Sequence, residues 1–262
     1  MERKIIPGQD LVMVGEVGTY AVNKLLELYP DRINKRFSKA YLDEELKKIS
    51  EQLCELEQWY NSAREARATH AVSDKKDTDE KWIETDPIES VLPGYRNTYG
   101  VTKIWPVERG GVLKALWDFC ESEAIDGETG RKKGNGAGCR FRYDRIPISQ
   151  FTTEICEIFD ITPYRLWSKD CFIMSMDKGT QFCEDFLEIQ LEKSQNLANE
   201  AFAKGTRSGF DSAAHVRTSE PVKTAVFGRF TTEKKRIRVD GDEIGYLTKE
   251  SYEELDKFIK IL

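Results

Sequence analysis

Residues 101–119 read Val101-Thr-Lys-Ile-Trp-Pro-Val-Glu-Arg-Gly-Gly-Val-Leu-Lys-Ala-Leu-Trp-Asp-Phe119 and decide the fold. The pattern predicts a β-strand, a tight glycine turn and then an amphipathic helix. A helix that begins at Gly111 directs unpaired backbone N–H groups, and the positive end of its dipole, at whatever lies above the strand. That geometry suits an anionic ligand, typically a phosphate.

The turn itself holds the first candidate site, an anion-binding corner made by Arg109, Gly110 and Gly111. Arg109 would supply positive charge and paired N–H donors. The alternative is that the two glycines only permit the turn and a close approach of strand and helix. Glu108 is a candidate base or ligand in the same corner, although a Glu before a helix also simply complements the dipole.

A second corner of the same kind follows the apolar strand over 9–15. Gly18 and Thr19 lie between that strand and a helix expected over 20–28. We expect them either to bind an anion or to serve as an ordinary helix start.

Composition excludes several classes of protein. The 262 residues carry 39% hydrophobic and 33% charged residues with a formal net charge of −6, which permits a buried core and argues against a basic nucleic-acid-binding face. Six cysteines form no Cys-x-x-Cys pair and only two histidines are present, so no metal site is expected. No signal peptide and no membrane-spanning apolar run are evident, which predicts a cytoplasmic protein with no membrane partner.

Strands and helices alternate along the chain, which predicts an α/β (α+β layered) fold. Ser38 is expected to cap a long helix, and Ser149 one over 150–159. Further helices are expected over 181–203 and 252–261, and Asp240-Gly241 marks a hairpin. We expect a single domain over 1–262, with insertions or loops at 71–97, 122–138 and 205–221.

Six ordered segments resemble one family. They are Asp10-Leu-Val-Met-Val-Gly with Gly18-Thr19, Arg109-Gly-Gly-Val-Leu-Lys-Ala-Leu-Trp, Asp144-Arg-Ile-Pro-Ile, Glu154-Ile-Cys-Glu-Ile-Phe-Asp-Ile-Thr-Pro-Tyr, Ala225-Val-Phe-Gly-Arg-Phe and Arg238-Val-Asp-Gly. In order and spacing they resemble the C-terminal half of AIR synthase-related proteins, a superfamily that includes aminoimidazole ribonucleotide synthetase, a hydrogenase maturation factor and thiamine-monophosphate kinase.

The resemblance implies a mixed β-sheet with helices packed mainly on one face. In that family the N-terminal half holds Mg-ATP, and we expect this chain to lack it. The implied function is ATP-dependent phosphoryl activation, with ATP and Mg²⁺ shared with a separately encoded N-terminal half and no cofactor held by this chain alone. A homo-oligomer is the other expected assembly.

The chain also departs from the family pattern. The family's loop often reads His-Asp-x-Thr-x-Gly-Gly, but Trp105 and Pro106 stand at the His and Asp positions. Neither side chain can bind a cation through a carboxylate or carry a proton. The alternative hypothesis is therefore a non-catalytic binding or scaffold protein, a possible pseudoenzyme, derived from this fold.

Overall fold

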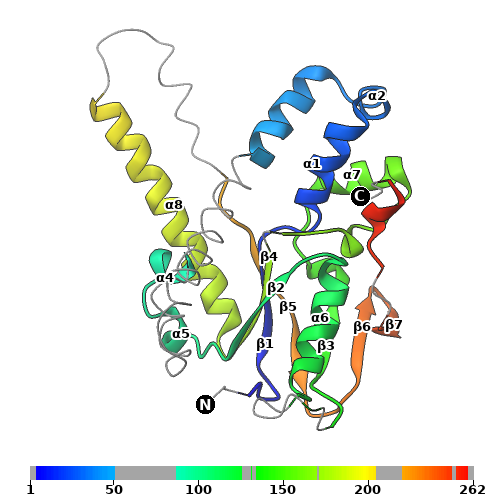
Figure 1. Ribbon diagram of the computed structural model, residues 1–262. Helices are drawn as coiled ribbons and strands as arrows, with labels where there is room; N and C mark the ends of the chain where they lie inside the picture. The colour runs from blue at the N-terminus through cyan, green and yellow to red at the C-terminus, as the bar shows by residue number, and fades with distance from the viewer. Residues whose placement is uncertain are drawn as a thin grey trace, which may run out of the picture.

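The computed structural model describes residues 4–50, 87–125, 131, 134–169, 171–204, 220–249 and 252–258. Their centre is a seven-stranded sheet in the order β2-β4-β1-β5-β3-β6-β7 (Figure 1). Its strands are β1 (Asp10–Val14), β2 (Lys103–Val107), β3 (Gly138–Arg142), β4 (Cys171–Met176), β5 (Thr224–Thr231), β6 (Arg236–Asp240) and β7 (Glu243–Tyr246). All neighbouring strands are antiparallel except β3 and β6, which are parallel. The α/β fold with a mixed sheet is therefore confirmed.

The helices follow the strands closely in sequence. They are α1 (Thr19–Leu28), α2 (Pro30–Ile33), α4 (Pro87–Val91), α5 (Tyr95–Thr98), α6 (Gly111–Ser122), α7 (Gln150–Phe159) and α8 (Gly179–Lys204), with helical residues also at 39–50. Short 3₁₀ turns lie at η2 (Tyr143–Arg145), η3 (Pro163–Arg165) and η4 (Glu254–Lys257).

Strand β1 is buried on both faces, and its side chains alternate between two cores. Leu11 and Met13 join the core beneath α6, whereas Val12 and Val14 join the core that contains Phe182 of α8. Alternation with a period of two is what a strand imposes. The apolar run Leu11–Val14 in the middle of the sheet is thus explained by helices on each side.

The expectation that helices pack mainly on one face is therefore wrong. Helix α6 covers one face, and α8 covers the other together with Tyr95 and Tyr99 from the α5 region. Figure 1 shows α6 and α8 on opposite sides of the strands. The sequence pattern gave no sign of this, because an amphipathic helix has the same pattern on either face of a sheet.

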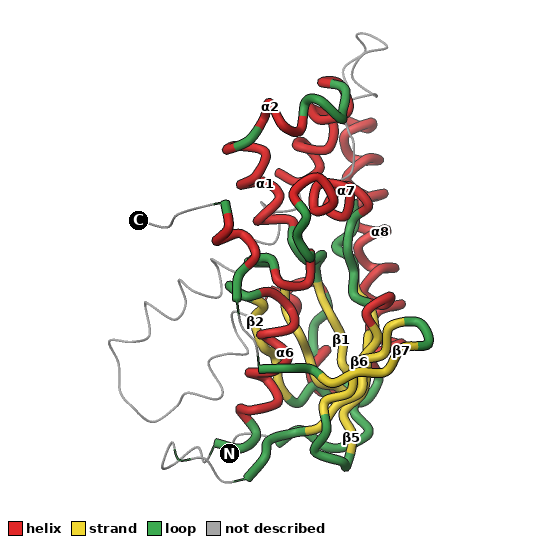
Figure 2. The backbone as a smooth tube through the Cα atoms, turned by 90° about the vertical axis from the view of Figure 1, so that its right-hand side faces the viewer, coloured by secondary structure: helices red, strands yellow, loops and turns green. Residues whose placement is uncertain are grey.

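A third core lies beyond the end of the sheet, among α1, α2 and α7. Leu25, Ile33, Phe151 and Ile155 are buried there. Figure 2 shows these helices gathered above the strands. Ser149 caps α7 as expected, since its hydroxyl accepts the Thr152 N–H at 3.0 Å.

Other expectations are met in part. The hairpin at Gly241 and the helix over 181–203 are present as β6–β7 and α8. Ser38 accepts the Tyr41 N–H at 3.3 Å at the start of the helical residues 39–50. The expected continuation of that helix lies outside the described residues, as do the insertion residues 71–86 and 205–219.

Two segments differ from expectation. Residues 87–97, expected to be part of an insertion or loop, contain α4 and most of α5, and Tyr95 is fully buried, so this part is not simply a loop. The described residues 252–258, expected to be α-helical, contain only the 3₁₀ turn η4. That turn is held by contacts far away in the sequence, which local periodicity does not encode.

Candidate anion-binding site

The two predicted glycine corners lie at the same end of the sheet. Strands β1 and β2 are both antiparallel to β4, so they run in the same direction. Gly18 follows the end of β1 and Gly110 follows the end of β2, and each is the N-cap of the next helix in the left-handed conformation, with φ of 81° and 91°. The sheet therefore brings together two segments more than 90 residues apart in sequence.

Gly111 is required by its surroundings. Its φ is 70°, and a Cβ at this position would overlap the main chain of Tyr164 and Arg165 in η3. The interpretation that the glycines permit a close approach is thus supported for Gly111. It does not exclude anion binding by the neighbouring N–H groups.

The N-terminus of α6 holds a carboxylate from the chain's own C-terminal region. Glu253 Oε2 accepts the Gly110 N–H at 2.6 Å, and Oε1 accepts the Trp167 N–H at 3.0 Å and the Leu255 N–H at 3.2 Å. Only 6% of Glu253 is exposed. Main-chain donors thus converge on one carboxylate where the dipole of α6 is positive.

Two opposing effects act on the Glu253 carboxyl. Burial raises its pKa above the ordinary value, while the N–H groups of Gly110, Leu255 and Trp167 oppose that shift because they stabilise the ionised form. The net shift of the Glu253 pKa is upward, so burial is the larger effect.

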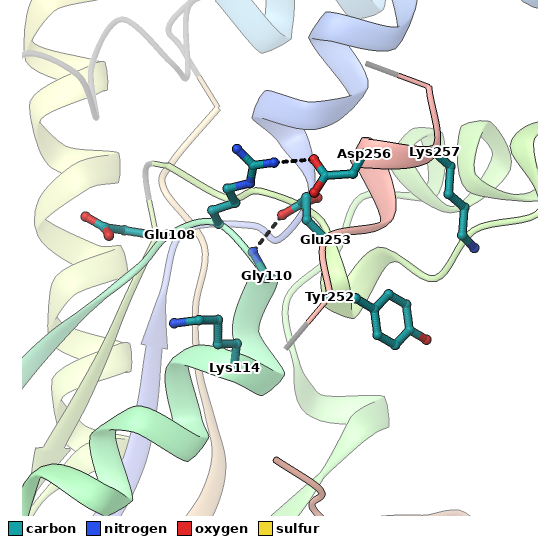
Figure 3. A pocket seen from close by; sticks show the side chains of 8 residues that line it. Glu108, Gly110, Lys114, Tyr252, Glu253, Asp256 and Lys257 are labelled. Carbon is teal, nitrogen blue, oxygen red and sulfur yellow. Dashed lines mark hydrogen bonds and ion pairs between the residues drawn. The ribbon is translucent and has the colours of Figure 1, made fainter. Parts of the chain in front are cut away.

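An open cavity of about 560 Å³ lies beside this carboxylate (Figure 3). Its lining residues come from the α6 corner and from the η4 segment: Glu108, Arg109, Gly110, Lys114, Tyr252, Glu253, Asp256 and Lys257. The three cations and three acids give it no net charge. Each cation already has an acidic partner, since Arg109 pairs with Asp256, Lys114 with Asp118 and Lys257 with Glu254.

Arg109 and Glu108 have different surroundings within the cavity. The hydrogen bond to Asp256 raises the pKa of the Arg109 guanidinium, which is charged in any case. Glu108 is exposed, and Figure 3 shows its side chain directed away from Glu253 and Asp256. Its main-chain carbonyl accepts the Gly111 N–H at 3.1 Å, which closes the turn.

The Gly18–Thr19 corner is satisfied differently. The Gly18 N–H donates to the Ser168 hydroxyl at 2.8 Å, and the Thr19 hydroxyl donates to the Glu16 carbonyl at 3.3 Å. Gly18 and Thr19 do not line the cavity at Gly110. Residues 166–168 link the two corners, since Ser168 accepts the Gly18 N–H and Trp167 donates to the Glu253 carboxylate that also accepts the Gly110 N–H.

The tryptophans considered for stacking on a ligand have protein partners. Trp105 stacks on Phe119 with ring centroids 5.8 Å apart, and Trp167 lies 4.9 Å from Tyr20. The guanidinium of Arg236 lies 4.0 Å from the Trp117 ring centroid. His215 lies outside the described residues.

Sequence reasoning missed the residues that complete the corner, above all Glu253 and Asp256. Both belong to the segment 252–261, for which the sequence predicted only a helix. Nothing local marks Glu253 as a partner of Gly110, which is 143 positions away.

The described residues contain no group of three or more His, Cys, Asp or Glu side chains placed to hold a metal ion. None of the helices in the described part of the chain has the length and apolar character needed to cross a membrane.

Comparison with known proteins gave structural matches alone. No family model matches the sequence, and no curated protein matches it. The solved structures with a similar fold include the hydrogenase maturation protein HypE of E. coli, with 12% identity, a TM-score of 0.47 and coverage of 97% of this chain and 53% of that chain.

Two further structures are similar in the same way. HypE in complex with ATP shows 10% identity and a TM-score of 0.45, over 95% of this chain and 52% of that chain. Thiamine monophosphate kinase from Aquifex aeolicus shows 10% identity and a TM-score of 0.39, over 90% and 53%. The chain thus spans about half the length of the structures it matches.

Proposed function

We propose that this chain binds a phosphorylated ligand at the α6 corner and takes part in ATP-dependent phosphoryl activation together with a second, ATP-binding half. The observation that carries the proposal is the carboxylate of Glu253, held by the N–H groups of Gly110 and Trp167. A corner that holds one buried anion by main-chain donors has the geometry for another. Phosphate offers oxygen atoms to the same donors.

A ligand at this corner must exchange with Glu253. Arg109 stands beside it with a half-exposed side chain and a partner, Asp256, on the same η4 segment. Exposed ion pairs contribute little to stability, about 0–1 kcal/mol. Arg109 can therefore transfer its donors from Asp256 to a phosphate at small cost, and that phosphate accepts them in a paired geometry.

The second half is proposed from the sequence resemblance. Proteins of that family hold ATP and Mg²⁺ in their N-terminal half, so we propose that both cofactors come with a separate partner. Trp105 and Pro106 at the family's His-Asp positions support the same division, because neither can hold Mg²⁺ or carry a proton. On this proposal, the chain contributes ligand binding and the partner contributes ATP.

A second candidate function is a binding or scaffold role without catalysis. The same corner motivates it, since Glu253 already satisfies the Gly110 N–H and Asp256 already neutralises Arg109. If the Glu253 carboxylate never leaves the Gly110 N–H, the corner only stabilises the fold and binds no ligand. Ligand binding distinguishes the two functions.

Isothermal titration of Mg-ATP and of inorganic phosphate into the isolated chain tests the proposal. We expect phosphate to bind and Mg-ATP to bind no more tightly than about 1 mM, roughly −4 kcal/mol. Micromolar binding of Mg-ATP by the isolated chain would contradict the need for a second half.

The variant Arg109→Ala distinguishes the proposed phosphate-binding function from the scaffold function. It should weaken phosphate binding about tenfold, because a charge-assisted hydrogen bond is worth about 1.5–3 kcal/mol. Arg36→Ala is the matched control, since Arg36 is also exposed and ion-paired, with Glu157 at 3.5 Å. Equal phosphate affinity in both variants would support the scaffold role.

A further inference from the structure

The two edges of the sheet are different. Edge strand β2 contains Pro106, which cannot donate a main-chain hydrogen bond and is typical of a protected edge. Edge strand β7 contains no proline, and its Ile244 and Tyr246 side chains are each 66% exposed. Figure 2 shows the β6–β7 hairpin at the margin of the sheet.

The outer main-chain groups of β7 belong to the two exposed apolar residues. The Leu247 N–H donates to the Arg236 carbonyl at 2.9 Å, and Gly245 lies opposite Arg238 in the same ladder. In an antiparallel ladder, alternate residues bond to the same neighbour. The N–H and C=O groups of Ile244 and Tyr246 therefore point out of the sheet edge.

The same residues extend an apolar face. Tyr246 lies opposite Ile237, and Ile244 lies opposite Val239, so all four side chains share one face of the hairpin. The Arg236 guanidinium stacks on Trp117 of α6, which places the odd-numbered residues of β6 on the face away from α6. Exposed apolar side chains on an open edge favour pairing with another strand.

Charge indicates which strand fits. Glu243 lies at the start of β7 and Lys249 lies three residues beyond its last residue, Tyr246, and both are exposed. In an antiparallel pair of identical strands centred on Tyr246, Glu243 of each copy lies opposite Lys249 of the other. Opposite charges directly across a strand pair are stabilising, and like charges are destabilising.

We propose that β7 pairs with β7 of a second copy of this chain, which makes the protein a two-fold symmetric dimer. Tyr246 lies on the two-fold axis opposite Tyr246 of the second copy, and Ile244 lies opposite Thr248. Continuing this register places Glu243 opposite Lys249 of the second copy, twice by symmetry. In this register, the main-chain hydrogen bonds between the two copies are formed by Ile244 and Tyr246, whose N–H and C=O groups point outward.

Sedimentation velocity of the wild-type chain over a range of concentrations provides the first test. We expect a reversible species of twice the chain's mass. A monomer at about 100 μM, or an open-ended series of larger species, would overturn the proposal.

Charge reversal tests the register. Glu243→Lys and Lys249→Glu should each raise the dimer dissociation constant about tenfold, since each change places like charges opposite each other at two symmetric positions. The double variant Glu243→Lys/Lys249→Glu should restore the wild-type value. Failure of the double variant to restore dimerisation would overturn this pairing.

Glu27→Lys is the matched control, because Glu27 is an exposed acid on α1, away from β7. It should leave the dissociation constant unchanged. All these positions are exposed, so the monomer should unfold at the wild-type temperature in each variant.

Discussion

Gly111 is constrained by both conformation and space. Its φ of 70° costs an L-residue about 1–2 kcal/mol, and a Cβ would also overlap the Tyr164 main chain. We predict that Gly111→Ala lowers the free energy of unfolding by about 2–5 kcal/mol, since overpacking adds about 1–3 kcal/mol to the conformational cost. Urea denaturation measures the change.

Gly94→Ala is the control for that prediction. Gly94 has nearly the same φ, 73°, but nothing within 4 Å of the position a Cβ would take. Gly94→Ala should lower the free energy of unfolding only by the conformational cost, about 1–2 kcal/mol. Equal losses in the two variants would show that η3 does not pack against α6 as closely as described.

Glu253 gives a prediction about pH. Its folded-state pKa is raised, mainly by burial, so its contribution to stability is fully present below the unfolded-state value and is lost as pH rises through the folded-state value. Glu253→Gln does not ionise and lacks this dependence. We predict that the wild-type free energy of unfolding, relative to Glu253→Gln, falls as pH rises from below 4.5 and then levels off.

Urea denaturation of both proteins across the acidic range checks this prediction. A relative stability that increases with pH would mean that the N–H donors outweigh burial and that the carboxylate is held more strongly than the raised pKa implies.

At the scale of elements, α7 depends on its N-cap. The Ser149 hydroxyl accepts the Thr152 N–H at 3.0 Å. We predict that Ser149→Ala lowers the free energy of unfolding by about 1 kcal/mol and that Ser149→Asp retains most of it. An unchanged midpoint in Ser149→Ala would show that packing of Phe151 and Ile155 alone fixes the helix start.

The sequence predicted those elements whose cause is local. The strand, glycine turn and helix at 101–119 follow from periodicity and from the freedom of Gly110, and Ser149 follows from capping chemistry. The segment 252–258 could not be predicted in the same way. Its acidic residues suit an exposed helix, yet Glu253 turns inward because Gly110 and Trp167 offer N–H groups to it.

At the scale of the whole molecule, strand order was beyond sequence reasoning. The sheet places β1 between β4 and β5, which are separated from it by more than 150 residues of chain. Such pairing depends on contacts between distant parts of the chain, which the local periodicity of the sequence does not reveal. The same holds for the placement of α6 and α8 on opposite faces.

This arrangement predicts a gradient of amide hydrogen exchange. The amides of β1 should exchange slowest among the strands, because β1 is flanked and fully buried. The Ile244 and Tyr246 amides should exchange rapidly in dilute solution, where no second copy pairs with them, and more slowly as concentration rises. Slow exchange at both positions regardless of concentration would contradict the open edge.

The central claim is that the α6 corner is an anion site whose occupant, Glu253, a phosphorylated ligand replaces. Titration of inorganic phosphate while recording the ¹⁵N–¹H resonances of Gly110 and Trp167 tests it most directly, with sodium chloride at matched ionic strength as the control. We predict saturable shifts of both amides with phosphate and not with chloride, reduced in Arg109→Ala. Amides that stay unshifted up to tens of millimolar phosphate, about −2 to −3 kcal/mol of binding, would contradict the claim and leave Glu253 as a permanent part of the fold.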